Sequence, residues 1–280
     1  IDRLISLLAS MGISKIRLTG GEPFVRTDLM ELIRRIVRIK GIDEVHITTN
    51  GILTAPHIAE LKTLGIRSIN LSLDTLDRER FKQITRRDEF ENTRETMRLA
   101  MKHEIPLKIN AVVMDGKNID DIIPMVELTR ELPISVRFIE EMPFNGEGSH
   151  YSRLVWTYTK IVEHIRPAFP SLEKIQDPRQ STAYHYQVPG FKGNIGVIAA
   201  FSRTFCGTCN RLRVTAQGEL KTCLYDNGVL NLKALMRAGE SDASLQSHLM
   251  NAFRNRAKDG FEAEARRGLV VTESMSTIGG

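Results

Sequence analysis

The sequence has no long apolar run, little net charge and only three cysteines. A transmembrane helix needs about 18 or more consecutive apolar residues, and no segment of the chain approaches that length. The first residues are amphipathic at helical spacing and do not resemble a signal peptide, in which a basic stretch precedes an apolar one. We therefore expect an unsecreted, cytoplasmic protein that does not associate with a membrane.

The charge balance is nearly even, because 39 Lys and Arg stand against 34 Asp and Glu and give a net charge of +5. Proteins that bind nucleic acid usually concentrate a stronger basic excess on one surface. A mild and scattered excess suits a small anionic ligand better. The composition thus argues against nucleic acid as a partner.

The cysteines are too few and too clustered for a disulfide framework, since Cys206, Cys209 and Cys223 share one short segment. Two of them, separated by two residues, can bind one metal or one side of a cluster. The third can reach the same site from the far strand of a hairpin predicted over 211–223. None of the seven histidines lies beside them, so a zinc ion would lack a nearby fourth ligand. Three thiolates suit a [4Fe–4S] cluster with one open iron, and a zinc ribbon with a distant fourth ligand is the alternative.

Strand-like runs alternate with helical patterns from residue 13 to about 141, at the spacing of parallel β/α units. The predicted strands are 15–19, 44–50, 68–74, 107–114 and 135–140, and the predicted helices between them are 28–39, 56–64, 91–103 and 119–131. After residue 143 this repeat is expected to end, and a helix near 154–165, hairpins near 184–200 and 211–223, and helices up to about 258 follow. We expect a barrel-like region over 1–143 and a smaller α+β region over 144–280.

Several predicted strands alternate between apolar and polar residues, although a parallel strand covered on both faces normally reads as a continuous apolar run. In a closed or partly closed barrel, alternate side chains point inward. The pattern therefore predicts an open barrel with a polar interior, and a doubly wound sheet with a polar crevice is the alternative. The polar positions are Arg17, Thr19, His46, Thr48, Asn50, Asn70, Ser72, Asp74, Lys108, Asn110 and Arg137.

Two further patterns indicate ligand binding. Arg211 and Arg213 are two residues apart, so on a strand both point the same way, and paired guanidinium groups bind phosphate well. The alternative is a solvated basic face. In the segment 19–23, Gly20 and Gly21 allow a ligand to approach the backbone, and Glu22 can accept a hydrogen bond from an ammonium group. By itself this segment could equally be a tight turn.

Taken in order, these segments resemble the GTP 3′,8-cyclases, radical S-adenosylmethionine enzymes of molybdenum cofactor biosynthesis. The resemblance lies in segments 15–23, 48–51, 71–74, 108–110, 139–143, 206–213 with Cys223, and 279–280. It implies an incomplete (β/α)6 TIM-like barrel of the radical SAM type with a C-terminal α+β region. It also implies the family reaction, in which a 5′-deoxyadenosyl radical takes hydrogen from C3′ of GTP and the ribose closes on C8 of guanine. Cyclic pyranopterin monophosphate synthase would be the pathway partner, and the family allows a homodimer.

The resemblance also implies roles for individual residues. It assigns Gly21, Ser72 and Met142 to S-adenosylmethionine, and Arg17, Thr48, Lys108, Arg211, Leu212 and Arg213 to GTP. Cys206, Cys209 and Cys223 would hold an auxiliary [4Fe–4S] cluster that meets the guanine, and Gly279 and Gly280 would reach into the site.

One feature of the family is missing from this sequence. The family holds its radical-generating [4Fe–4S] cluster with a C-x3-C-x2-C triplet, which this sequence lacks, and we expect an N-terminal truncation to be the cause. Two other functions stay open: another radical enzyme with an auxiliary cluster, such as a peptide-modifying maturase, and a non-catalytic zinc-ribbon binding protein.

Overall fold

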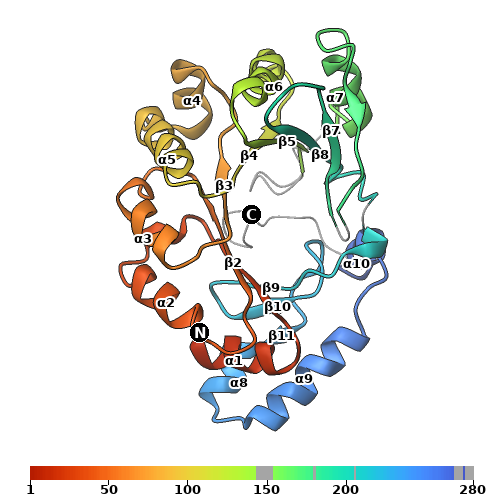
Figure 1. The fold of residues 1–280 in the computed structure, drawn as a ribbon. Coiled ribbons are helices and arrows are strands. Elements are labelled where there is room, and N and C mark those ends of the chain that lie inside the picture. Colours follow the sequence, from red (N-terminus) through yellow and green to blue (C-terminus); the bar gives the residue numbers. More distant parts are fainter. Residues whose placement is uncertain (143–153, 179–180, 205, 268–273, 275–280) are drawn as a thin grey trace.

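The computed structural model describes residues 1–142, 154–178, 181–204, 206–267 and 274. Its main feature is a curved sheet of eight strands in the order β1-β2-β3-β4-β5-β8-β7-β6 (Figure 1). The first six strands in this order are parallel, and β7 and β6 extend the sheet in antiparallel fashion. The strands are β1 (Lys15–Leu18), β2 (Glu44–Thr49), β3 (Ser68–Ser72), β4 (Leu107–Val113), β5 (Ser135–Glu140), β6 (Glu173–Lys174), β7 (Tyr184–Gln187) and β8 (Asn194–Ile198).

Helices cover the outer, convex side of this sheet (Figure 1). They are α2 (Leu29–Ile36), α3 (Ile58–Thr63), α4 (Arg78–Thr85), α5 (Phe90–Lys102), α6 (Ile122–Glu131) and α7 (Tyr158–Ile165), with short 3₁₀ turns at Pro23–Val25, Ala55–His57 and Ile119–Asp121. Because the parallel strands follow chain order without a reversal, the sheet is an open, partial barrel. The doubly wound alternative is therefore wrong.

The five predicted strands are confirmed, and each ends within two residues of its predicted bounds. Helix α4 was not predicted, because it is strongly polar and buries only Phe81. The parallel repeat also does not end near residue 143, since β8 pairs in parallel with β5 as well as antiparallel with β7. The edge of the sheet thus does not coincide with the expected division between 1–143 and 144–280.

The core lies between the sheet and the outer helices. The side chains of Ile47, Ile69, Ile109, Val136 and Val197 are fully buried there, one from each of five neighbouring strands. Burying one such side chain contributes about 1.5–3 kcal/mol. The intervening residues of β4 and β5 are more exposed, so the predicted alternation between an apolar and a polar face is confirmed.

The C-terminal region adds a second, smaller layer, shown at the bottom of Figure 1. A three-stranded sheet is followed by three helices: β9 (Arg213–Val214), β10 (Glu219–Lys221), β11 (Leu230–Asn231), α8 (Leu232–Arg237), α9 (Asp242–Arg254) and α10 (Gly260–Arg267). Helix α1 (Asp2–Ser10) joins the two layers, because Ile5 packs in the main core while Leu7 and Leu8 pack with Leu220 and Leu249. Among the described helices, none has both the length and the apolar character to cross a membrane.

A buried carboxylate connects the end of β5 to the chain that follows β8. Glu140 is fully buried, and its two oxygens accept hydrogen bonds from the backbone N–H groups of Tyr158 (2.7 Å), Phe201 (2.9 Å) and Ser202 (2.7 Å). The Ser202 hydroxyl donates a fourth hydrogen bond at 2.8 Å. These contacts fix the segment that leads from the sheet to Cys206.

Replacing Glu140 by alanine should lower the free energy of unfolding by roughly 3 kcal/mol, because several buried donors lose a charged acceptor. Urea unfolding followed by circular dichroism measures this. The matched control is Glu131→Ala, which removes an exposed carboxylate from an ion pair with Lys192 (2.9 Å) and should change stability little. Equal losses from both substitutions would contradict the anchoring role.

Candidate ligand-binding lumen and thiol site

The concave side of the sheet, here called the lumen, carries positive charge. Arg17 on β1, Lys108 on β4 and Arg137 on β5 all lie on this face, as the alternation predicts. No hydrogen bond or ion pair joins these three side chains to the other described residues, and the Nε atom of Arg137 is buried without a partner. A buried donor that the protein leaves unpaired is a candidate for contact with a ligand.

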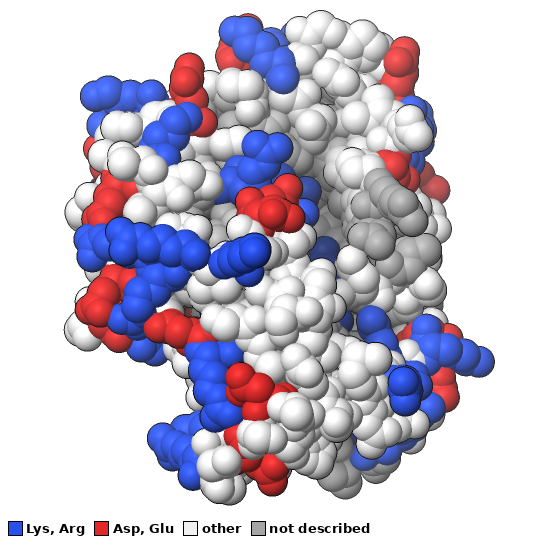
Figure 2. Space-filling model, turned by 60° about the horizontal axis from the view of Figure 1, so that its bottom comes forward, with Lys and Arg blue, Asp and Glu red and all other residues white. Residues whose placement is uncertain are grey.

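The C-terminal hairpin adds two more cations to the lumen. Burial and then the charges of Arg211, Arg137 and Arg213 together lower the pKa of Arg17 to about 10. Burial followed by repulsion from Arg211 likewise brings the pKa values of Arg137 and Arg213 to about 10. All of these guanidinium groups stay charged at neutral pH. Five cations, counting Lys108, therefore converge from both regions of the chain, and Lys and Arg atoms are visible inside the hollow in Figure 2.

The acidic residue at the base of the lumen does not neutralise this cluster. Glu44 pairs with Lys15 at 2.7 Å and with His46 at 2.9 Å, and these hydrogen bonds hold its pKa at about 2. His46 also contacts Ser68 at 2.7 Å. Glu44 is thus already engaged by Lys15 and His46, and Arg211 donates a hydrogen bond to Thr182 Oγ1 at 2.8 Å. An anionic ligand would relieve the repulsion among the cations.

The three cysteines occupy one neighbourhood next to the lumen. Cys206 begins a 3₁₀ turn, Cys209 donates its backbone N–H to the Cys206 carbonyl at 3.2 Å, and Cys223 follows β10. Burial raises the pKa of Cys206, and the neighbouring Cys209 adds to this; burial also raises the pKa of Cys223, with contributions from Asp226 and Cys206. The charges of Cys209 and Cys223 both raise the pKa of Arg213, against the larger effect of burial. The thiols therefore interact with one another and with the cationic lumen.

The donor set, three thiols with no histidine beside them in the sequence, has the chemistry of an iron–sulfur cluster site. Among the residues described, no three His, Cys, Asp or Glu side chains are arranged around one metal ion. A [4Fe–4S] cluster separates its ligands more widely, because each thiolate binds a different iron. Cys223 is also held in place, since Asp226 accepts hydrogen bonds from the backbone N–H groups of Thr222 and Cys223, both at 2.8 Å. Three free, half-buried thiols of this kind could hold an iron–sulfur cluster.

The remaining expected site residues take different positions. Thr48 is 8% exposed on β2, Ser72 ends β3, and Gly21 is exposed in the turn after β1. Met142 packs in the small cluster that contains Tyr225 and Cys223, so it lies beside the thiol site.

Three findings differ from, or add to, the expectations. Leu212 is partly buried and packs against the small core that contains residues of α1, α8 and α9, and its contact with GTP stays a prediction. Glu22 is already used, because it accepts hydrogen bonds from Thr49 Oγ1 (2.8 Å) and from the backbone N–H groups of Asn50 (2.7 Å) and Phe24 (3.1 Å). The sequence analysis places Arg137 on the polar face but does not assign it to a ligand. Its alternation with Val136 and Phe138 is the sequence signal that could have identified it. Gly279 and Gly280 lie outside the described residues.

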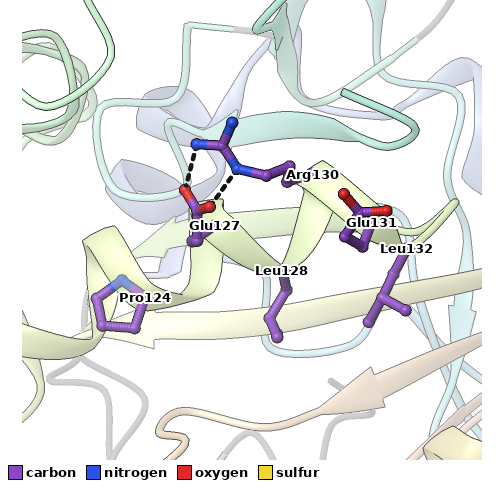
Figure 3. A pocket seen from close by; sticks show the side chains of 6 residues that line it. All are labelled: Pro124, Glu127, Leu128, Arg130, Glu131 and Leu132. Carbon is purple, nitrogen blue, oxygen red and sulfur yellow. Dashed lines mark hydrogen bonds and ion pairs between the residues drawn. The ribbon is translucent and has the colours of Figure 1, made fainter. Parts of the chain in front are cut away.

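A separate, open hollow lies on the outer side of α6 (Figure 3). Its charged side chains are paired, since Arg130 donates to Glu127 at 3.0 Å and Glu131 pairs with Lys192. This hollow therefore offers no free charge to a ligand, and the lumen is the better candidate site.

Comparison with known proteins assigns the family. A model of the radical SAM superfamily matches residues 1–129, and a model described as Molybdenum Cofactor Synthesis C matches residues 134–261. The GTP 3′,8-cyclase of Chlorobaculum tepidum is 39% identical over the whole chain and 84% of its own length. This chain belongs to the GTP 3′,8-cyclase family. The mitochondrial GTP 3′,8-cyclase of Arabidopsis thaliana is 38% identical, again over the whole chain, and is covered over 72% of its length.

Other relatives of this GTP 3′,8-cyclase family member are longer. Human molybdenum cofactor biosynthesis protein 1 is 42% identical over 86% of the chain, which spans 38% of that protein. Among solved structures, SuiB of Streptococcus suis bound to S-adenosylmethionine aligns with a TM-score of 0.56 at 16% identity, over 88% of this chain and 59% of SuiB. At this identity the likeness concerns the fold alone, and it agrees with an α/β radical SAM fold.

Lys108 should make anion binding in the lumen depend on pH. Burial, followed by repulsion from Arg137 and Arg17, lowers its pKa to about 8, so the free protein loses this charge as the pH rises through that value. A bound anion favours the charged form. Affinity for a nucleoside triphosphate should therefore fall by up to about tenfold between about pH 7.5 and pH 9. Isothermal titration calorimetry measures it. Lys108→Met should bind more weakly and show a flatter pH profile; an unchanged slope in this variant would assign the titration to another group.

Proposed function

We propose that this chain provides the GTP-binding and cluster-binding part of a GTP 3′,8-cyclase, the enzyme that converts GTP to 3′,8-cyclo-7,8-dihydro-GTP in molybdenum cofactor biosynthesis. The main support is the convergence of Arg17, Lys108, Arg137, Arg211 and Arg213 next to three thiols. A triphosphate carries enough charge to balance such a cluster. Polynucleotides, which also carry phosphate, are usually bound by basic residues spread along one surface, whereas these five cations gather on the concave side of the sheet.

The chain's own residues would act mainly by positioning the substrate. Arg211 and Arg213, from the C-terminal hairpin, would hold the triphosphate together with Arg17. Cys206, Cys209 and Cys223 would hold the auxiliary cluster at the guanine end. When bound, S-adenosylmethionine supplies the hydrogen-abstracting radical, and the auxiliary cluster supplies an open iron. The sheet wall and its outer helices would keep water away from the reacting sugar.

The contacts to S-adenosylmethionine are also proposals. Gly21, Ser72 and Met142 would contact S-adenosylmethionine, as the family assignment suggests. All three cysteines of the sequence are assigned to the auxiliary cluster, so none is left for the radical-generating one. Cyclic pyranopterin monophosphate synthase as the next enzyme, a homodimer and a cytoplasmic location belong to the same proposal.

A peptide-modifying radical enzyme is the second candidate, because SuiB has also been solved with its precursor peptide SuiA and aligns with a TM-score of 0.52. That likeness has 13% identity and concerns the fold. Five converging cations suit a peptide poorly, unless the peptide is strongly acidic. Binding of GTP, and not of peptide, separates the two functions.

Substituting Arg213 by alanine should weaken GTP binding about ten- to a hundredfold, because one charge-assisted hydrogen bond to phosphate is worth roughly 1.5–3 kcal/mol. Guanosine offers no phosphate and should bind the wild type and the variant equally. Equilibrium binding of both ligands, with melting curves alongside, tests this. Arg94→Ala, which removes an exposed arginine beside Glu91, is the control and should leave both affinities unchanged. Unchanged GTP affinity in Arg213→Ala would refute the phosphate contact.

The thiol site should take up about four irons per chain on anaerobic reconstitution, because three thiolates favour a [4Fe–4S] cluster with one open iron. Iron, sulfide and zinc analysis gives the result. Replacing Cys223 by serine should abolish stable uptake, whereas Ser247→Ala on α9 should leave it unchanged. Tightly bound zinc in place of iron would support the zinc-ribbon alternative.

A further inference from the structure

Arg203 is a buried cation that the proposed reaction does not use. It is 5% exposed, and its φ of 54° lies in the left-handed region, which is strained for a long side chain. Its backbone N–H donates to the Ala199 carbonyl at 2.8 Å, and its own carbonyl accepts the Cys206 N–H at 3.2 Å. Arg203 therefore forms the turn that presents Cys206. A strained turn persists only where other contacts hold it.

The Arg203 side chain supplies those contacts by joining three segments. Its guanidinium carbon lies 3.7 Å from the centre of the Tyr225 ring and 4.5 Å from that of Phe261. Its Nη1 atom donates to the Gly260 carbonyl at 3.1 Å and pairs with Glu264 at 2.8 Å. Tyr225 is two residues after Cys223, and the other three partners belong to α10. One side chain thus ties the Cys206 turn to the Cys223 loop and to α10.

Helix α10 in turn packs directly against the first thiol. A Cβ atom at Gly260 would lie 2.9 Å from Cδ of Arg203 and 3.3 Å from Sγ of Cys206, so only glycine leaves room for both. A backbone hydrogen bond from Gly260 to Cys206 lowers the pKa of that thiol, against the larger effect of burial. Tyr225 closes the arrangement by donating its hydroxyl to the Ala200 carbonyl at 3.1 Å.

We infer that Arg203 is a positioning residue, which fixes the spacing between Cys206 and Cys223 before a cluster is bound. The inference rests on the proposed function, because it assumes that these thiols act together as ligands. Its physical basis is that a guanidinium group between two aromatic rings, with two hydrogen-bonded partners, leaves the attached loops little freedom. Without it, the hydrogen bond from Tyr225 to Ala200 would remain between the two loops, but the Cys206 turn would lose its side-chain contacts with Tyr225 and α10.

The test compares Arg203→Met, Arg203→Lys and a matched control. Methionine keeps an apolar stem of similar length but removes the charge, while lysine keeps a cation for the rings and for Glu264. The control is Arg80→Met, which removes another arginine that pairs with a largely buried carboxylate, Asp121, far from the thiols. Two measurements are made on each: the rate at which a chelator removes the reconstituted cluster, and the yield of a short bifunctional maleimide cross-link between Cys206 and Cys223 in the metal-free protein.

In Arg203→Met, the cluster should be lost about tenfold faster and the cross-link yield should fall severalfold, with lysine restoring part of both. Arg80→Met should lower the melting temperature but retain the cluster and the cross-link like the wild type. Wild-type values in Arg203→Met would overturn the inference, and so would equal losses in Arg80→Met, which would trace the effect to general destabilisation. If the wild type takes up no iron, the proposed cluster fails, while the cross-link still decides the role of Arg203.

Discussion

Repulsion among the cations that converge on the lumen is the main constraint on this structure. Arg17 and Arg137 lie on strands of the main sheet, while Arg211 and Arg213 come from the C-terminal hairpin, and all of them lower the pKa of a neighbour. Such a cluster destabilises the folded protein unless an anion balances it. The apolar core behind the strands provides the stability that offsets this repulsion. The charge that opposes folding is therefore the same charge that would bind a triphosphate.

The cationic cluster forms only because the two regions of the chain are held together at several points. Strand β8 extends the main sheet from the C-terminal region, and α1 shares its apolar residues between both cores. Glu140 connects the end of β5 to the segment before Cys206 through four hydrogen bonds. These contacts explain why Arg211 lies close enough to lower the pKa of Arg17, which is nearly two hundred residues away in the sequence.

The thiol site depends on a separate set of contacts behind it. Asp226 orients the backbone of Cys223, and Arg203 joins the turn of Cys206 to Tyr225 and α10. None of these residues belongs to the lumen. Different residues thus support ligand binding and thiol spacing. A substitution in one set can change its property without directly removing the other.

The sequence alone determined the local features of this protein. Alternation of apolar and polar residues located the parallel strands and placed Arg17, Lys108 and Arg137 on the polar face, because side chains of a strand point alternately to its two sides. Cysteine spacing located the thiol site. Tertiary structure decided what these local signals cannot contain. Strand β8 continues the main sheet, and Glu22 accepts hydrogen bonds from Thr49 and Asn50. Leu212 packs against a core, and Arg203 contacts Tyr225 and α10 beside the thiols. Each of these depends on contacts between segments distant in sequence, and periodicity within one segment carries no information about its partner.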